Sequence, residues 1–404
     1  MKLVLAAALV TALAFLGSRL PVLKRRLASV PWPLGVQNLL LSGTEFVLVG
    51  LVLGHAGLGI LDQRTLTGLF PFVGMGLAWI GLLFGVQWEA RVLRSLSSAG
   101  VAPALGQSLV TGMAVAIPFY FLFDWLFPLE RGLALIGAVA VGAAASDTAH
   151  SGLALVVRHL GGADQTRRQP AVQLLRYITD LDGLVGVVAI GVAACVPVLH
   201  RGQPLPFWLA ASVGLGLGVG LLVVLLVAHR VGEDELRLIL LGAVLFSGGL
   251  SLYLSLSPLL VNLVAGAAIA NLAGDRARAT IRTALMRGEH AIYVLFLLVV
   301  GADWSPGSPT VAGLVAAYLI LRTAGKLVGG WLCFWPLRGQ LPRAPHLGLG
   351  LLSHGGMAIA IVVNLQQIHR SELTDAVISI VLVGVVVSEL VSPSLLRRAL
   401  GRAP

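Results

Sequence analysis

Apolar residues run in stretches of about 20 along nearly the whole chain, and short segments rich in Pro, Gly and charge separate them. Stretches of this length cross a bilayer as α-helices, whereas the short alternating segments typical of a membrane β-barrel do not occur in the sequence. The pattern therefore predicts thirteen membrane spans. They lie near residues 2–18, 36–55, 65–86, 103–127, 132–157, 171–199, 206–229, 236–254, 257–273, 285–302, 309–335, 346–366 and 373–396.

The composition agrees with an all-α polytopic membrane protein. Hydrophobic residues make up 57% of the chain and charged residues 11%, with a mean hydropathy of +0.92, which excludes a soluble domain. The first stretch has the length of a signal peptide, but it lacks a clear small-residue cleavage pattern and a basic cluster follows it, so we interpret it as a retained span. Cys195 and Cys333 lie in or beside apolar segments and predict neither a disulfide nor a metal site.

The distribution of positive charge predicts the topology. The net charge is +10, but the basic residues lie in loops between spans rather than in one patch, so a nucleic-acid partner is not expected. Loops after the odd-numbered spans, together with the C-terminal tail, contain 20 of the 28 Lys and Arg residues, and the opposite loops contain 4. Because positive loops stay in the cytoplasm, the N-terminus is expected outside and the C-terminus inside.

An internal repeat divides the chain into two halves. Val47–Gly54 (VLVGLVLG) aligns with Leu263–Ala270 (LVAGAAIA), and Gly85–Trp88 (GVQW) aligns with Gly301–Trp304 (GADW). Chance similarity between apolar segments is the alternative, but both pairs share one offset of 216 residues. This offset covers seven spans, an odd number, which predicts inverted repeats of the kind that build secondary transporters.

Two aspartates stand at membrane depth on adjacent spans. Asp147 lies 11 residues before Arg158, and Asp180 lies 10 residues after Pro170, so each is roughly 15 Å below the same membrane surface. A carboxylate at this depth costs roughly 3 kcal/mol or more, which favours an ion or proton site over an acid that faces a vestibule or neutralises a buried base. Asp147 also stands in a segment rich in small and polar residues, Gly142–Gly152 (GAAASDTAHSG), which predicts an interrupted helix.

A basic residue and a second interruption are predicted in the other half. Lys326 lies 10 residues before Pro336, again roughly 15 Å deep, and we expect it to compensate an acid rather than to extend towards the interface. Arg322 is the competing partner. Gly355 and Gly356 predict a break in the twelfth span, although glycine pairs also serve close helix packing. Two crossed interrupted helices would result, with Asp147 and Lys326 neutralising their opposed dipole ends.

These motifs resemble those of the monovalent cation/proton antiporter superfamily, in particular the branch of bacterial sodium/proton exchangers and potassium efflux antiporters. The resemblance covers nearly the whole chain, and each motif taken singly is moderately specific. Besides Asp147 and Asp180, it rests on four segments, which are Glu45–Leu61 (EFVLVGLVLGHAGLGIL), Ser257–Asn271 (SPLLVNLVAGAAIAN), Gly325–Gly329 (GKLVG) and Leu351–Gly356 (LLSHGG).

The resemblance assigns roles to individual residues. Ser146 and Asp147 match the Thr-Asp pair of the unwound helix, Asp180 matches the essential cation and proton carboxylate, and Lys326 matches the core lysine. Thr179 stands where exchangers that move unequal charge have a second Asp, and this departure favours exchange nearer one cation for one proton. Asp182 is an additional acid about 200° round the helix from Asp180, and we expect it to face a vestibule.

Several other residues surround this predicted site. Thr148 and Gly152 belong to the first interruption. His150 and His354 lie in or beside the two breaks and are candidates for pH tuning, with a packed or water-facing imidazole as the alternative. No zinc-type cluster, phosphate-binding glycine loop or enzyme-like arrangement is found in the sequence, so we expect neither a cofactor nor an enzyme.

The resemblance implies a secondary antiporter that exchanges Na+ or K+ for protons by alternating access. Residues 101–199 and 303–404 would form the core ion-transport domain, and residues 1–100 and 200–302 the scaffold and dimerisation domain. A homodimer in the lipid bilayer of a bacterial inner membrane is expected. A non-transporting sensor or channel subunit is the alternative, motivated by Thr179 and Asp182, and electrogenic symport of another solute is a third reading.

Overall fold

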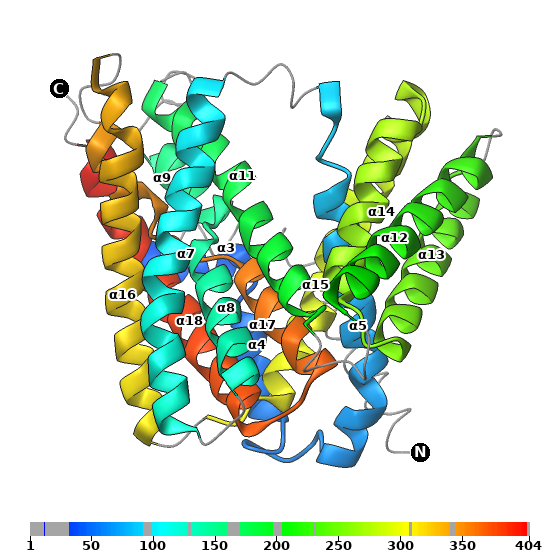
Figure 1. The fold of residues 1–404 in the computed structure, drawn as a ribbon, viewed down its shortest axis with the longest axis horizontal. Coiled ribbons are helices and arrows are strands. Elements are labelled where there is room, and N and C mark those ends of the chain that lie inside the picture. The colour runs from blue at the N-terminus through cyan, green and yellow to red at the C-terminus, as the bar shows by residue number, and fades with distance from the viewer. Residues whose placement is uncertain are drawn as a thin grey trace.

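The computed structural model describes residue 12 and residues 32–91, 98–127, 131–159, 170–196, 204–228, 232–306, 309–339 and 344–401. Within these ranges every regular element is a helix and no strand is present (Figure 1). The first half contains α3 (Leu34–Ser42), α4 (Glu45–Leu53), α5 (Gln63–Gly85), α7 (Ser98–Leu126), α8 (Arg131–Ser146), α9 (His150–His159) and α11 (Pro170–Ala193). The second contains α12 (Leu205–Val227), α13 (Glu233–Tyr253), α14 (Pro258–Leu272), α15 (Asp275–Asp303), α16 (Pro309–Phe334), η2 (Trp335–Gly339), η3 (Ala344–Leu351), α17 (Gly356–Ile368) and α18 (Glu372–Gly401).

The predicted all-α membrane architecture is confirmed. Eight described helices are long and apolar enough to cross a membrane, or nine if the bent pair α3–α4 is counted as one span, and α14 and α17 are shorter apolar helices. Every predicted span from the second onward corresponds to a helix or an interrupted helix in the described residues. The predicted first span, residues 2–18, lies outside them.

The order of elements repeats along the chain. The series α4, α5, α7, α8–α9 and α11 is followed by α14, α15, α16, η3–α17 and α18 in the same order. The packing is reciprocal, because α4 contacts α15 while α5 contacts α14. This exchange of partners is what two halves related by a two-fold axis produce. Each of these two series contains one interrupted element between its long helices, α8–α9 in the first and η3–α17 in the second.

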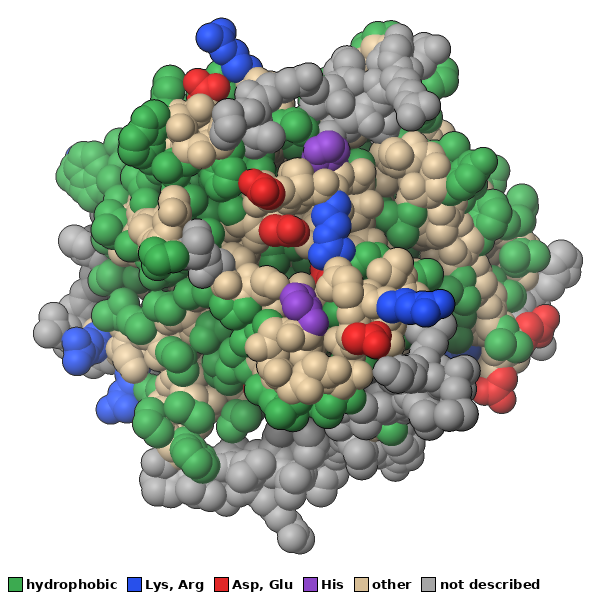
Figure 2. All heavy atoms as spheres, turned by 90° about the horizontal axis from the view of Figure 1, so that it is seen from below, with side chains coloured by type: hydrophobic (Ala, Val, Ile, Leu, Met, Phe, Trp, Pro, Cys, Tyr) green, Lys and Arg blue, Asp and Glu red, His purple; other side chains and the backbone are tan. Residues whose placement is uncertain are grey.

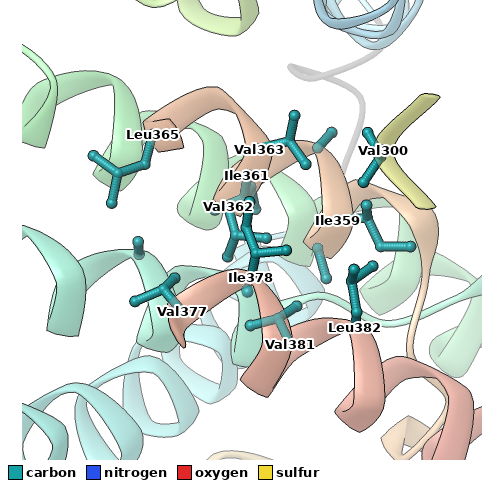
Figure 3. Close-up of a cluster of buried hydrophobic side chains, with 14 of the residues drawn as sticks. Val300, Ile359, Ile361, Val362, Val363, Leu365, Val377, Ile378, Val381 and Leu382 are labelled. Carbon is teal, nitrogen blue, oxygen red and sulfur yellow. The ribbon is translucent and has the colours of Figure 1, made fainter. Parts of the chain in front are cut away.

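An apolar core holds α17, the helix after the second interruption, in place. Side chains from α17, including Ile359, Val362 and Val363, pack against Val377 and Val381 of α18 in the cluster that Figure 3 shows. All five side chains are almost completely buried. Burial of this kind stabilises each side chain by roughly 1.5–3 kcal/mol in water. Within a bilayer the surrounding lipid is also apolar, so the close packing of these side chains sets the position of the helix but does not drive its burial.

Charged side chains gather on one face of the molecule. Figure 2 shows acidic, basic and histidine side chains gathered near the middle of the face seen from below. Asp303, at the end of α15, accepts hydrogen bonds from Arg370 at 3.0 and 3.1 Å. The Arg370 guanidinium also lies 5.3 Å from the ring centroid of Phe70 on α5. This contact links the segment between α17 and α18 to α5 and α15.

Candidate ion-binding site

The first interruption separates α8, which ends at Ser146, from α9, which begins at His150. A helix end leaves carbonyl groups without intrahelical partners, and inside a membrane these need other donors. The Lys326 ammonium donates to the Ser146 carbonyl at 2.6 Å. The Arg322 guanidinium donates to the Asp147 carbonyl at 3.0 Å. Two basic side chains of α16 therefore satisfy the backbone that the break exposes.

The second interruption separates η3, which ends at Leu351, from α17, which begins at Gly356. Arg322 also donates to the carbonyls of Leu352 at 2.9 Å and Ser353 at 3.0 Å. One guanidinium thus binds both interruptions. The Ala149 amide donates to the Ser353 carbonyl at 3.3 Å, which brings the two breaks into direct contact. The predicted crossing of two interrupted helices is confirmed.

Glycines allow this close approach. A Cβ atom on Gly355 would lie 2.8 Å from the Asp147 Oδ2 atom, and one on Gly152 would lie 2.6 Å from the Ser353 Oγ atom. Both distances are shorter than real Cβ contacts. With no side chain at position 355, its amide donates to Asp147 Oδ2 at 3.2 Å. The Asp147 carboxylate therefore binds the N-terminal end of the opposite half-helix, where the helix dipole favours negative charge.

Lys326 and Asp182 form a fully buried ion pair. The Lys326 Nζ atom lies 3.5 Å from Asp182 Oδ2 and 2.8 Å from the Thr148 hydroxyl, and both charged side chains are 0% exposed. The second carboxylate oxygen, Oδ1, is buried without a hydrogen-bond partner. The free energy needed to remove two charges from water can exceed the free energy gained from their attraction. The stability of the fold alone therefore does not explain the presence of this pair. A buried oxygen with free acceptor capacity beside a lysine is a suitable place for an exchangeable cation or proton.

Asp180 occupies a different environment. Its side chain is 54% exposed, and Oδ1 lies 2.7 Å from Nε2 of His150, itself 56% exposed. This is the reverse of the sequence-based expectation, which placed Asp180 beside Asp147 and Lys326 and turned Asp182 towards a vestibule. The two acids do lie on different sides of α11, but the buried side carries Asp182. The reason is the rotation of α11 about its axis, since Gln173 and Arg176 are exposed on the same stripe as Asp180.

The other predicted residues lie around the crossing. Thr179 is buried and donates its hydroxyl to the Arg176 carbonyl at 2.8 Å, and Ser146 donates its hydroxyl to the Ala143 carbonyl at 2.7 Å. His354 is completely buried, with Nε2 at 3.0 Å from the Tyr318 hydroxyl and 3.1 Å from the Ala144 carbonyl oxygen. His354 is therefore packed in the core, whereas His150 is accessible.

A cavity of about 290 Å³ leads to the crossing from between α5, α15 and the interrupted helices. Its wall includes Asp147, Thr148, His150 and Thr179, but Asp182 is not part of it. The cavity therefore reaches Asp147 but not Asp182. The wall also contains Ser42, Glu289, Tyr293 and Glu389, none of which was among the predicted site residues. Of these, Glu389 had a visible signal, since it is an acid inside the last apolar stretch.

Fold and site together define a polytopic membrane protein with two crossed interrupted helices and buried charges at their crossing. Among solved structures, the fold is similar to that of the sodium proton antiporter MjNhaP1 from Methanocaldococcus jannaschii, with a TM-score of 0.66 and 16% sequence identity. The match covers 100% of this chain and 99% of that one. No protein-family model and no curated protein sequence matches the chain. The comparison therefore establishes the fold.

Proposed function

We propose that this protein exchanges a monovalent cation, Na+ or K+, for protons across a membrane by alternating access. The observation that carries the proposal is the buried Asp182–Lys326 pair beside Asp147 at the crossing of the interrupted helices. The similarity of the fold to a sodium proton antiporter supports it. A transporter of this kind carries out no covalent chemistry, so the proposal does not include an enzymatic activity.

Charge balance explains the coupling. Two carboxylates, Asp147 and Asp182, share the buried centre with two bases, Arg322 and Lys326, and the charges sum to zero when all four groups are ionised. A cation that enters adds one positive charge at a depth where net charge is costly. Binding is therefore favourable when one proton leaves the centre. We infer an exchange of about one cation for one proton, with the cation replacing the Lys326 ammonium at Asp182.

Alternating access requires two parts that move relative to each other. We propose that residues 101–199 and 303–404 form the moving core and residues 1–100 and 200–302 the scaffold, through which two copies of the chain associate. The position of the cavity supports this division, since its wall combines side chains of α5 and α15 with those of the interrupted helices. The proposed location is a bacterial inner membrane, with the cavity facing the cytoplasm.

The test compares two aspartates on one helix. Asp182→Asn is expected to abolish cation-dependent proton movement in everted membrane vesicles that contain a pH-sensitive dye. Asp180→Asn, two residues away and half-exposed, is the matched control and is expected to retain it. The assignment is wrong if Asp182→Asn exchanges normally. Absence of any Na+ or K+ response in the unaltered protein would favour the alternative, a sensor or channel subunit on the same scaffold.

A further inference from the structure

A third helix break lies beside the same cavity. α3 ends at Ser42 and α4 begins at Glu45, and the two helices meet at an angle of 72°. Gly43 between them has φ +86°, a left-handed conformation that glycine adopts without strain. The break places the Ser42 and Thr44 hydroxyl oxygens 3.0 Å apart. Two oxygen atoms of the kind that bind alkali cations therefore meet at one bend in the chain.

Glu389 of α18 faces this bend. Its carboxylate Oε2 accepts a hydrogen bond from the Ser42 hydroxyl at 2.8 Å, and its backbone carbonyl accepts one from the Asn38 amide at 3.3 Å. The Glu389 side chain is completely buried, yet its Oε1 atom has no hydrogen-bond partner. Within the described residues no Lys or Arg forms an ion pair with Glu389. A buried acceptor without a partner is expensive unless something occupies it during the working cycle.

The cavity connects Glu389 to the crossing. Glu389, Ser42 and Glu289 line the same cavity as Asp147, and in the part of the chain that the structure describes neither Lys nor Arg lines it. A narrow apolar-walled space lined by carboxylates concentrates cations. The oxygen donors at Glu389 are its carboxylate and the hydroxyl groups of Ser42 and Thr44, and in the described ranges no group of three or more His, Cys, Asp or Glu side chains could hold a metal ion.

Tyr293 shapes the space between the two acids. Its ring lies 3.6 Å from where a Cβ atom on Gly43 would stand, and its hydroxyl occupies the position that a side chain at Gly356 would take. Tyr293 therefore fits between the α3–α4 break and the start of α17. This position separates the bend at Ser42 from the crossing at Asp147 while both remain on one cavity wall.

We propose that Glu389 and the Ser42 hydroxyl form a second binding site for a monovalent cation, which holds the ion in the cavity before it passes to Asp147. The role of this site in transport rests on the proposed exchange function, whereas binding at the site does not. The site raises the occupancy of the cavity at low cation concentration. It is distinct from the crossing, because its donors come from α3 and α18 rather than from α8, α11 and α16.

Transport kinetics provide the first test. Glu389→Gln is expected to raise the apparent KM for Na+ or K+ by about tenfold in everted vesicles, the equivalent of losing one charge-assisted contact. Glu372→Gln is the matched control, since Glu372 lies on the same helix but is exposed at its first turn. An unchanged KM in a well-inserted Glu389→Gln protein overturns the proposal.

A binding measurement on the unaltered protein keeps the proposal testable if the variant does not fold. Dicyclohexylcarbodiimide modifies protonated carboxyl groups inside membranes, and mass spectrometry locates the modified residue. Na+ or K+ is expected to lower modification of Glu389 several-fold, whereas choline is not, because its methylated ammonium keeps oxygen ligands at a distance from the charge. Equal modification with and without the alkali cation refutes the second site. Protection of Glu389 in a protein that lacks cation-coupled proton flux would refute the transport proposal alone.

Discussion

At the level of single residues, Lys326 and Arg322 each have an electrostatic role and a hydrogen-bonding role. They supply the positive charges that balance Asp147 and Asp182, and they donate to the carbonyl groups of Ser146, Asp147, Leu352 and Ser353. Charge compensation alone would not need these contacts. Because both residues lie on α16 four positions apart, one rigid helix fixes both interruptions.

Lys326→Met is expected to destabilise the protein by about 3–5 kcal/mol, since it leaves the Asp182 carboxylate buried without a counter-charge and the Ser146 carbonyl without a donor. The double variant Lys326→Met/Asp182→Asn is expected to regain part of this loss. Thermal unfolding of the detergent-purified protein measures both. Equal stability of the single variant and the unaltered protein would mean that the pair is not a structural element of the fold.

Asp180→Ala is expected to change stability by no more than about 1 kcal/mol, because a half-exposed polar contact such as Asp180–His150 contributes little even when the imidazole is charged. Thermal unfolding under the same conditions checks this value. A loss as large as that of Lys326→Met would indicate that Asp180 is buried in the working protein.

At the level of elements, the sequence predicts where helices and breaks lie but not how a helix is rotated. The break at Asp147 follows from the run of small and polar residues around it, and its partner follows from the pair of glycines before α17. The choice between Asp180 and Asp182 depends on which side of α11 faces the crossing. Gln173, Arg176 and Asp180 at positions i, i+3 and i+7 form one polar stripe, and this pattern would have assigned Asp180 to the accessible side.

The sequence motifs do not identify Glu389 as a site residue, and the reason differs from that for Asp182. Its partner Ser42 is 347 positions away, and their contact depends on how α3 packs against α18. Neither residue belongs to the segments that resemble the antiporter superfamily. An acid in the middle of an apolar span was a visible signal, but the hydroxyl groups that face it are defined by tertiary structure.

Gly152→Ala is expected to push the two interruptions apart, because its Cβ atom would lie 2.6 Å from the Ser353 Oγ atom, and to lower both thermal stability and cation-dependent proton flux. Adding Ser353→Ala should restore part of the loss by removing that oxygen. Gly218→Ala on α12 is the control, since a Cβ atom there has nothing within 4 Å, and alanine favours the helix by about 1 kcal/mol. Equal effects at positions 152 and 218 would contradict the close crossing.

At the level of the whole molecule, the fold and the membrane topology rest on different observations. The predicted fold is confirmed by the observed order of helices and by the similarity of the structure to that of a sodium proton antiporter. The orientation in the membrane remains a prediction from the 20 basic residues on one side and 4 on the other. The direction in which the cavity opens depends on this orientation.

Cysteine labelling tests the orientation. In a Cys195→Ala/Cys333→Ala background, Glu235→Cys in the first turn of α13 is expected to react with a membrane-impermeant maleimide only from the cytoplasmic side. Glu372→Cys at the start of α18 is expected to react only from outside. Both native residues are exposed glutamates in the first turn of a helix, so their accessibility is matched. The opposite pattern would invert the predicted topology.

The contacts of the Arg322 guanidinium bear on the rate of the proposed exchange. The guanidinium binds Asp147 on one interruption and Leu352 and Ser353 on the other, so the two interruptions are joined as one unit. Under the proposed alternating access, both interruptions would have to move together, and each ion would wait for the displacement of a whole bundle. The proposal therefore predicts a turnover set by domain motions in the microsecond-to-millisecond range or slower, far below the throughput of a channel.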